Sequence, residues 1–146
     1  MRVLVVDDEY DIRYLVQAAL EHCEVLTAAD GPSALALLRH TDIDAVFLDV
    51  MMPGMDGFSV LRWIRADERF RDLPVIMLTA KAGEHDHLRA FKDGADAYLT
   101  KPFGVDDLDD TLAQVTSRSR AERAVARAEE LARAQLLVQI EHSFGI

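Results

Sequence analysis

Cysteine is almost absent from this sequence of 146 residues, because Cys23 is the only one. A single thiol excludes an internal disulfide and a metal site built from several cysteines. Long apolar runs are also absent, and none approaches the roughly 20 residues that a membrane-spanning helix needs. The start of the chain turns acidic at Asp7 after a short apolar run, which is unlike a signal peptide. We therefore expect a cytoplasmic protein that makes no use of a membrane.

Basic residues are few, since 16 Lys and Arg stand against 26 Asp and Glu and the formal net charge is −10. This acidity argues against direct nucleic-acid binding, because the phosphates of nucleic acid would be repelled. Half of the residues are hydrophobic and 29% are charged, which is the balance of a globular protein. The length suffices for one domain with a hydrophobic core and a short appendage.

The charge is unevenly distributed along the chain. Residues 1–112 carry 11 basic and 22 acidic side chains, whereas residues 113–146 carry 5 and 4. The second part also has no proline, and Gly145 is its only glycine. We therefore predict a domain over residues 1–115 and a helical extension over residues 116–146.

Short apolar runs without strict alternation recur along the first part of the chain. Such runs are typical of strands buried on both faces of a parallel sheet. Between them, apolar residues recur at the three- and four-residue spacing of amphipathic helices, most weakly over residues 84–92. Five such units with right-handed crossovers predict a doubly wound α/β fold with a five-stranded parallel sheet of order 2-1-3-4-5. The runs are Val3–Val6, Val25–Ala28, Ala45–Leu48, Val75–Leu78 and Ala97–Leu99.

Chemically active side chains follow these runs. Asp7 and Asp8 follow the first run, Asp49 the third, Thr79 the fourth, and Lys101 comes just after the fifth. Because ligands of a doubly wound sheet bind at the carboxyl ends of its strands, these groups should meet there. Three converging carboxylates repel one another, and a cation that prefers oxygen ligands, Mg²⁺ or Mn²⁺, would offset the repulsion. The central Asp49 is then the natural nucleophile for an aspartyl phosphate.

Four motifs occur in this order along the chain: VLVVDDE, FLDVMMPGMDG, VIMLTA and AYLTKPF. Together they resemble the receiver domain of bacterial two-component response regulators over about residues 2–115. The resemblance implies a CheY-like fold and the transfer of a phosphoryl group to Asp49 from a sensor histidine kinase or a phosphotransfer protein. It also implies a protein that is not an enzyme, apart from slow loss of its own phosphoryl group.

The resemblance further implies a metal site. Asp8 would bind Mg²⁺ directly and Asp7 largely through water, with Asp49 and the backbone carbonyl of Met51 as further ligands. The family varies at the positions of Met51 and Lys81, which flank the path of an attacking water molecule. These two side chains are therefore expected to tune the lifetime of the phosphoryl group.

A second group of residues would respond to the phosphoryl group. The resemblance implies that Thr79, Ala80 and Lys101 contact its oxygens, and that Tyr98 turns inward behind Thr79. The bond between Lys101 and Pro102 would be cis, which proline permits at modest cost. The resemblance thus implies a switch of the surface formed by the fourth helix, fifth strand and fifth helix.

Each of these residues has an ordinary explanation when it is taken alone. Asp7 and Asp8 could cap a helix, Thr79 could be a turn hydroxyl, and Lys101 could be a solvated surface charge. Their occurrence together at successive strand ends makes coincidence improbable. Tyr98 has a second explanation that stays open, in which its side chain is a static part of the core and does not move.

Three other functions can be weighed against the phosphoacceptor. A phosphohydrolase of the haloacid dehalogenase type should have an acid two residues after its nucleophile, where this chain has Met51. A flavodoxin-like cofactor binder should have a loop rich in Ser, Thr and Gly where this chain has the acidic residues 7–9. An interaction module that works without phosphorylation would not need the complete set of site residues.

Residues 118–140 are rich in Ala, Arg, Glu and Leu and predict a helix that needs a partner for its apolar face. We expect it to continue the fifth helix and to pair two chains, giving a homodimer through the fourth helix, fifth strand, fifth helix and this extension. A helix folded back on its own domain is one alternative. Another is a signalling linker in a fragment of a larger regulator whose output domain is absent. The predicted coiled-coil seam consists of Ala121, Ala124, Ala128, Leu131, Gln135 and Val138.

Overall fold

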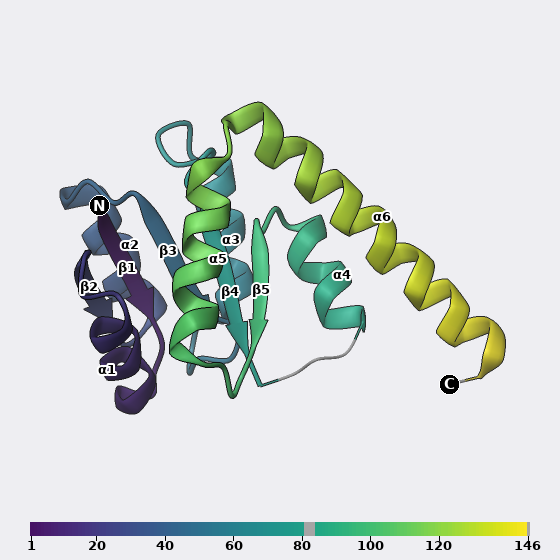
Figure 1. Ribbon diagram of the computed structural model, residues 1–146, viewed down its shortest axis with the longest axis horizontal. Helices are drawn as coiled ribbons and strands as arrows, with labels where there is room; N and C mark the ends of the chain where they lie inside the picture. Colours follow the sequence, from purple (N-terminus) through teal and green to yellow (C-terminus); the bar gives the residue numbers. More distant parts are fainter. Residues whose placement is uncertain (81–83, 146) are drawn as a thin grey trace.

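The computed structural model describes residues 1–80 and 84–145, in which five strands and five helices alternate before a long sixth helix (Figure 1). Lys81, for which a role in phosphoryl lifetime is predicted, lies outside the described residues. The strands are β1 Arg2–Val6, β2 Glu24–Ala28, β3 Ala45–Asp49, β4 Val75–Thr79 and β5 Ala97–Thr100. The helices are α1 Tyr10–Ala19, α2 Gly31–His40, α3 Gly57–Ala66, α4 Glu84–Lys92, α5 Val105–Ser117 and α6 Arg120–Phe144.

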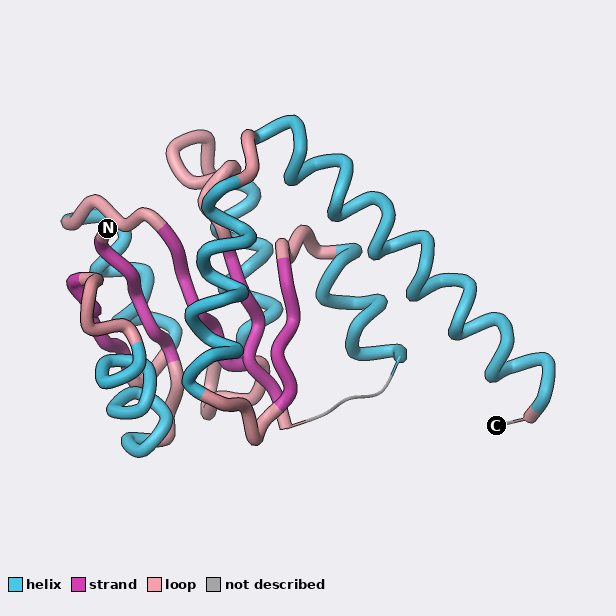
Figure 2. Tube along the Cα trace, viewed as in Figure 1, coloured by secondary structure: helices cyan, strands magenta, loops and turns pink. Residues whose placement is uncertain are grey.

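The strands form one sheet in the order β2-β1-β3-β4-β5, and every neighbouring pair is parallel. This confirms the predicted doubly wound fold. The central strands are almost fully buried, whereas β2 and β5 are only partly covered because each lies at an edge of the sheet. The loops that follow the strands gather at one edge (Figure 2), which is where the candidate site lies.

Two apolar cores fill the space on the two faces of the sheet, since strand side chains alternate between the faces. One core joins the sheet to α2, α3 and Ala90 of α4, and the other joins it to α1 and α5. In Figure 1, α1 and α5 lie in front of the sheet, with α2 and α3 behind it. Helix starts are fixed locally: Asp30 accepts a hydrogen bond from Ser33 N, and Asp56 accepts one from Ser59 N.

The final helix does not continue α5, so that expectation was wrong. The backbone of Arg118 and Ser119 is extended, and α6 begins with a capping box in which Ser119 and Glu122 exchange hydrogen bonds. From there α6 runs back along α4, its main contact in the structure (Figure 1). The helix therefore folds back on its own domain, the alternative that the sequence left open.

The face that α6 turns to the domain also differs from the predicted seam. Four of the six seam residues are exposed, and the residues packed toward the domain follow a different stripe of the helix. The predicted seam is the more apolar of the two stripes, but the other stripe carries Arg123 and Arg127, which pair with the buried Asp96. Helical periodicity alone could not reveal that distant partner. Among the described residues, α6 included, no helix has the length and apolar character of a membrane span. The stripe toward the domain consists of Arg123, Arg127, Glu130, Ala134 and Leu137.

Candidate functional site

The end of β1 supplies two of the predicted carboxylates. Asp7 is fully buried because the four residues before it form a buried strand, whereas Asp8 is exposed at the rim. The Asp7 side chain accepts a hydrogen bond of 2.9 Å from Glu9 N, and its backbone carbonyl accepts one of 2.7 Å from the Arg13 guanidinium. These bonds fix the turn that leads from the strand into α1.

Asp49 ends β3, and its side chain is almost completely buried. The chain after it turns sharply back, so that Gly57 N donates a hydrogen bond to the carbonyl of Val50. A Cβ atom at Gly57 would lie only 2.0 Å from the backbone oxygen of Asp49, and therefore only glycine fits at this position. Met51 N donates a 3.4 Å hydrogen bond to Asp49 Oδ1, while the Met51 side chain is exposed at the rim.

Asp7, Asp8 and Asp49 converge as the sequence predicted. Each offers a carboxylate oxygen, and these oxygens all lie within 4.8 Å of one another. Burial and the charge of Asp7 raise the pKa of Asp49 to about 7, although Lys101 and the Met51 N–H oppose the rise. Oxygen ligands at this spacing, with one carboxylate exposed for entry, fit a small divalent cation such as Mg²⁺ or Mn²⁺.

Lys101 brings a positive charge into this cluster. Its Nζ lies 2.9 Å from Asp7 Oδ2, 3.5 Å from Asp49 Oδ1 and 3.3 Å from Glu9 Oε1. Burial lowers the pKa of Lys101, but the bond to Asp7 and the charges of Asp49 and Asp7 raise it more, so the ammonium form is favoured. The peptide bond to Pro102 is cis, as the resemblance implied. No role was predicted for Glu9, although its place next to the two aspartates was a signal.

Thr79 and Tyr98 connect the site to the neighbouring edge strand. Thr79 is fully buried at the end of β4, and its carbonyl accepts a 2.6 Å hydrogen bond from Lys101 N. Partial burial raises the pKa of Tyr98, while a hydrogen bond with the Thr79 side chain opposes the rise. The Tyr98 ring packs on His87 with ring centroids 4.0 Å apart. Ala80 follows β4 and is exposed beside the site.

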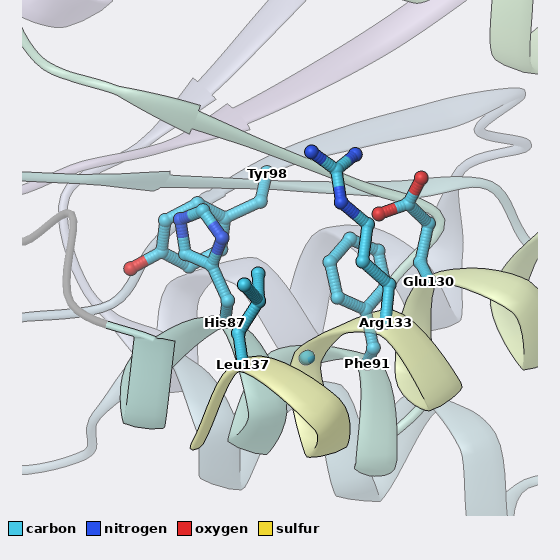
Figure 3. Close-up of a pocket in the computed structure, with 7 residues that line it drawn as sticks. His87, Phe91, Tyr98, Glu130, Arg133 and Leu137 are labelled. Carbon is cyan, nitrogen blue, oxygen red and sulfur yellow. The ribbon is translucent and has the colours of Figure 1, made fainter. Parts of the chain in front are cut away.

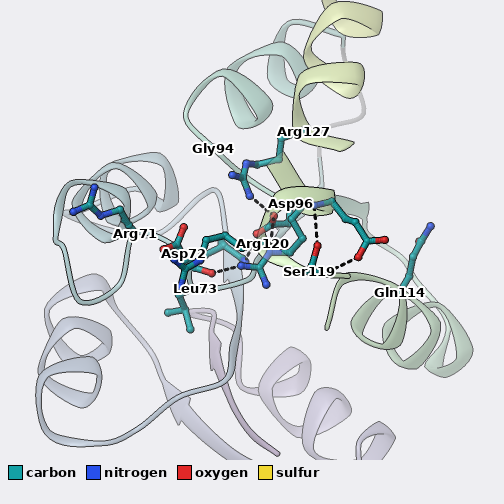
Figure 4. Close-up of polar contacts among 12 residues, drawn as sticks. Arg71, Asp72, Leu73, Gly94, Asp96, Gln114, Ser119, Arg120 and Arg127 are labelled. Carbon is teal, nitrogen blue, oxygen red and sulfur yellow. Dashed lines mark hydrogen bonds and ion pairs between the residues drawn. The ribbon is translucent and has the colours of Figure 1, made fainter. Parts of the chain in front are cut away.

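A buried ion cluster around Asp96 was missed from the sequence. Asp96 lies just before β5 and accepts hydrogen bonds from Arg65 at 3.0 Å, Val75 N at 2.9 Å and Arg127 at 2.7 Å (Figure 4). Arg123 Nε lies 3.8 Å from the same carboxylate. Burial lowers the pKa of Arg65 to about 10, against the opposing charge of Asp96. The only signal was an acidic residue inside an apolar segment, because its arginine partners lie 27 to 31 residues away along the chain.

A cavity of about 200 Å³ lies between α6, α4 and β5. Tyr98 and His87 lie together on one side, and Leu137 projects toward them from α6 (Figure 3). The cavity is lined by His87, Phe91, Tyr98, Glu130, Arg133, Ala134 and Leu137.

Comparison with known proteins agrees with this geometry. A family model described as the response regulator receiver domain matches residues 3–113. Response regulator PleD of Caulobacter vibrioides is 46% identical over 109 residues, which cover 73% of this chain and 24% of that protein. Protein PilG of Pseudomonas aeruginosa is 39% identical over 110 residues, which cover 74% of this chain and 82% of that protein. The chain spans about a quarter of the length of PleD and about half of the length of the heme response regulator HssR of Staphylococcus haemolyticus.

Comparison with solved structures also finds similarity to response regulators and a chemotaxis protein. Chemotaxis protein CheY4 of Vibrio cholerae superposes with a TM-score of 0.75 at 36% identity, covering 78% of this chain and 97% of that one. A putative response regulator from Chloroflexus aurantiacus superposes with a TM-score of 0.77 at 31% identity, covering 80% and 98%. In both cases the match covers most of this chain and nearly all of the other structure.

Proposed function

This chain belongs to the family of response regulator receiver domains, and from that premise we propose that Asp49 is its phosphoryl acceptor. A carboxylate oxygen of Asp49 attacks the phosphorus of a phosphohistidine on a sensor histidine kinase or a phosphotransfer protein. The P–N bond breaks, the electron pair stays on the imidazole, and an acyl phosphate forms. The observation that supports this most is the meeting of three carboxylate oxygens within 4.8 Å beside one ammonium group.

We propose Asp7, Asp8, Asp49 and the backbone carbonyl of Met51 as the residues that hold Mg²⁺ or Mn²⁺. The fit rests on the donor set, because the clustered carboxylates are hard oxygen ligands and one of them is exposed. When bound, the cation offsets the charge of the phosphoryl oxygens and of the carboxylates around them. It also favours the ionised form of Asp49, whose pKa is otherwise raised to about 7.

The remaining groups act on the phosphoryl oxygens. Lys101 is already 3.5 Å from Asp49 Oδ1, so its ammonium group can pair with an oxygen added there. The Thr79 hydroxyl and the backbone N–H of Ala80 donate hydrogen bonds to the same group. Lys101 stands beside Asp49 before transfer, so positioning and charge are the main contributions to the rate.

We propose that phosphorylation of Asp49 changes the surface formed by α4, β5 and α5. In this structure α6 already covers α4, so pairing of two chains through that surface requires α6 to move. A protein of this kind turns over no external phosphate ester and only loses its own phosphoryl group slowly. Met51, which replaces the acid expected in a phosphohydrolase, supports this.

Incubation with acetyl phosphate and Mg²⁺, followed by mass spectrometry, tests the proposal. We expect the mass to increase by one phosphoryl group and the label to map to Asp49. The Asp49→Asn variant should stay unlabelled, and the Asp42→Asn variant, which changes an exposed aspartate at the opposite end of β3, should be labelled normally. Labelling that is independent of Mg²⁺, or that survives in Asp49→Asn, would refute the assignment.

A further inference from the structure

The two halves of α6 are held to the domain in different ways. The first half is anchored by charge: Arg123 and Arg127 both face the buried Asp96, and Arg120 pairs with Asp72 at 3.2 Å. Arg123 also donates a hydrogen bond to the backbone carbonyl of Asp72. Removing these arginines from Asp96 would leave a buried carboxylate with less of its compensating charge, which is costly. The start of α6 is therefore firmly attached.

The second half of α6 is held to the domain by apolar contacts rather than by charge. Among the described residues, no ion pair or side-chain hydrogen bond joins it to the rest of the domain. Ala134 is its one buried residue, and Leu131, Leu137 and Val138 are only half-buried, so each gives up part of the stabilisation of full burial. Leu136, Ile140 and Phe144 are exposed. This half therefore lacks the buried ion pairs that hold the first half to the domain.

Packing is incomplete where this half meets the domain. The cavity of about 200 Å³ lies between Leu137 on α6 and the paired rings of His87 and Tyr98 (Figure 3). His87 Nε2 is buried and has no hydrogen-bond partner among the described residues, which further weakens the contact. Because the Tyr98 ring lines this cavity opposite Leu137, its position affects how closely α6 packs on the domain.

Tyr98 also contacts the phosphoryl site. Its side chain hydrogen-bonds with Thr79, while its ring forms one wall of the cavity under α6. A phosphoryl oxygen at Asp49 competes for the Thr79 hydroxyl, so phosphorylation changes the partner that Tyr98 has in this structure. One side chain therefore belongs both to the site and to the surface on which α6 lies.

We propose that the surface of α4 and β5 is a docking site for a helix, that α6 fills it within the same chain, and that phosphorylation of Asp49 loosens residues 131–144 while residues 120–130 stay bound. The proposal rests on the proposed function of Asp49. Once Thr79 turns to the phosphoryl group, the Tyr98 ring moves toward the space beside Thr79 and the cavity widens. The second half of α6 then loses support, whereas the ion pairs of Asp96 are untouched.

Hydrogen exchange of the full chain tests this. With Mg²⁺ and beryllofluoride as a stable phosphoryl mimic, we expect amides of residues 131–144 to exchange at least about threefold faster, with residues 120–130 unchanged. The Asp49→Asn variant should show no change. If the mimic binds and exchange in residues 131–144 stays the same, the inference is wrong and the proposed function stands. Faster exchange along the whole of α6 also overturns it.

Two variants test the route through Tyr98 without any phosphoryl group. Tyr98→Ala removes one wall of the cavity and should speed exchange in residues 131–144 by a similar factor. Tyr14→Ala, which removes an exposed tyrosine from α1, should leave α6 unchanged. Slow exchange in the central strands shows that each variant is folded. An unchanged α6 in a folded Tyr98→Ala protein overturns the coupling. Failure of Asp49 to accept a phosphoryl group instead removes the proposed function, on which the inference depends.

Discussion

Lys101 Nζ lies 2.9 Å from Asp7 Oδ2, and the aspartate is fully buried. This ion pair joins the end of the first strand to the loop after the last one, across the centre of the site. The same ammonium group lies within 3.5 Å of Asp49, so one cation faces two buried carboxylates. The balance of charge at this point decides whether Asp49 is ionised, and several predictions depend on it.

Replacing Lys101 with methionine removes the ammonium group and keeps the length of the side chain. The pKa of Asp49, already raised to about 7, should rise further because Lys101 lowers it. We expect labelling of Asp49 by acetyl phosphate at neutral pH to fall by about tenfold or more, as for the loss of a charged group at a reacting centre. Lys92→Met, at an exposed position of α4, is the matched control. Equal labelling of both variants would show that Lys101 has no role in transfer.

Stability without metal should depend on pH through Asp49. Its pKa is raised from 3.8 to about 7 in the folded state, so its protonated form stabilises the fold and this contribution is lost as pH rises through about 7. Between pH 5.5 and 8, the free energy of unfolding in EDTA should fall by about 2 kcal/mol from this group. Urea denaturation of Asp49→Asn should lack that fall. A wild-type curve that is flat over this range would contradict the raised pKa.

Gly57 should tolerate no side chain. The Cβ of alanine would lie 2.0 Å from the backbone oxygen of Asp49, so the turn that positions the acceptor must shift. We expect Gly57→Ala to lose about 1–3 kcal/mol of stability in urea denaturation and to be labelled more slowly at Asp49. Gly104→Ala, where the nearest atom is 3.5 Å away, should change both by much less. Similar effects of the two substitutions would indicate that close packing at Gly57 is not the cause.

The Asp96 cluster should contribute strongly to stability. Asp96→Ala leaves Arg65, Arg123 and Arg127 without their shared carboxylate, and breaking a buried pair typically costs about 3–5 kcal/mol. Glu68→Ala, which removes an exposed pair of 3.7 Å with Arg71, should cost less than about 1 kcal/mol. Urea denaturation followed by circular dichroism gives both values. A loss of less than about 1 kcal/mol for Asp96→Ala would show that the cluster is only marginally favourable.

Much of the site could be predicted because its residues follow strands that are recognisable locally. Apolar runs such as Val75–Leu78 are typical of strands buried on both faces, and parallel strands end at one edge of the sheet. The meeting of Asp7 with Asp49 therefore follows from the order of elements alone. Thr79 reaches the same edge for the same reason. The contact of Glu9 with Lys101 could not be predicted in this way, because it depends on the path of a loop.

The course of α6 was decided only by the tertiary structure. Its sequence determined a helix, since Ala, Leu, Glu and Arg favour one wherever it lies, and Ser119 with Glu122 determined where it begins. The direction of the helix depends on Asp96, whose pairing with Arg127 joins residues 31 apart in the chain. Local periodicity reports which residues share a face, but the partner of that face is set by distant side chains.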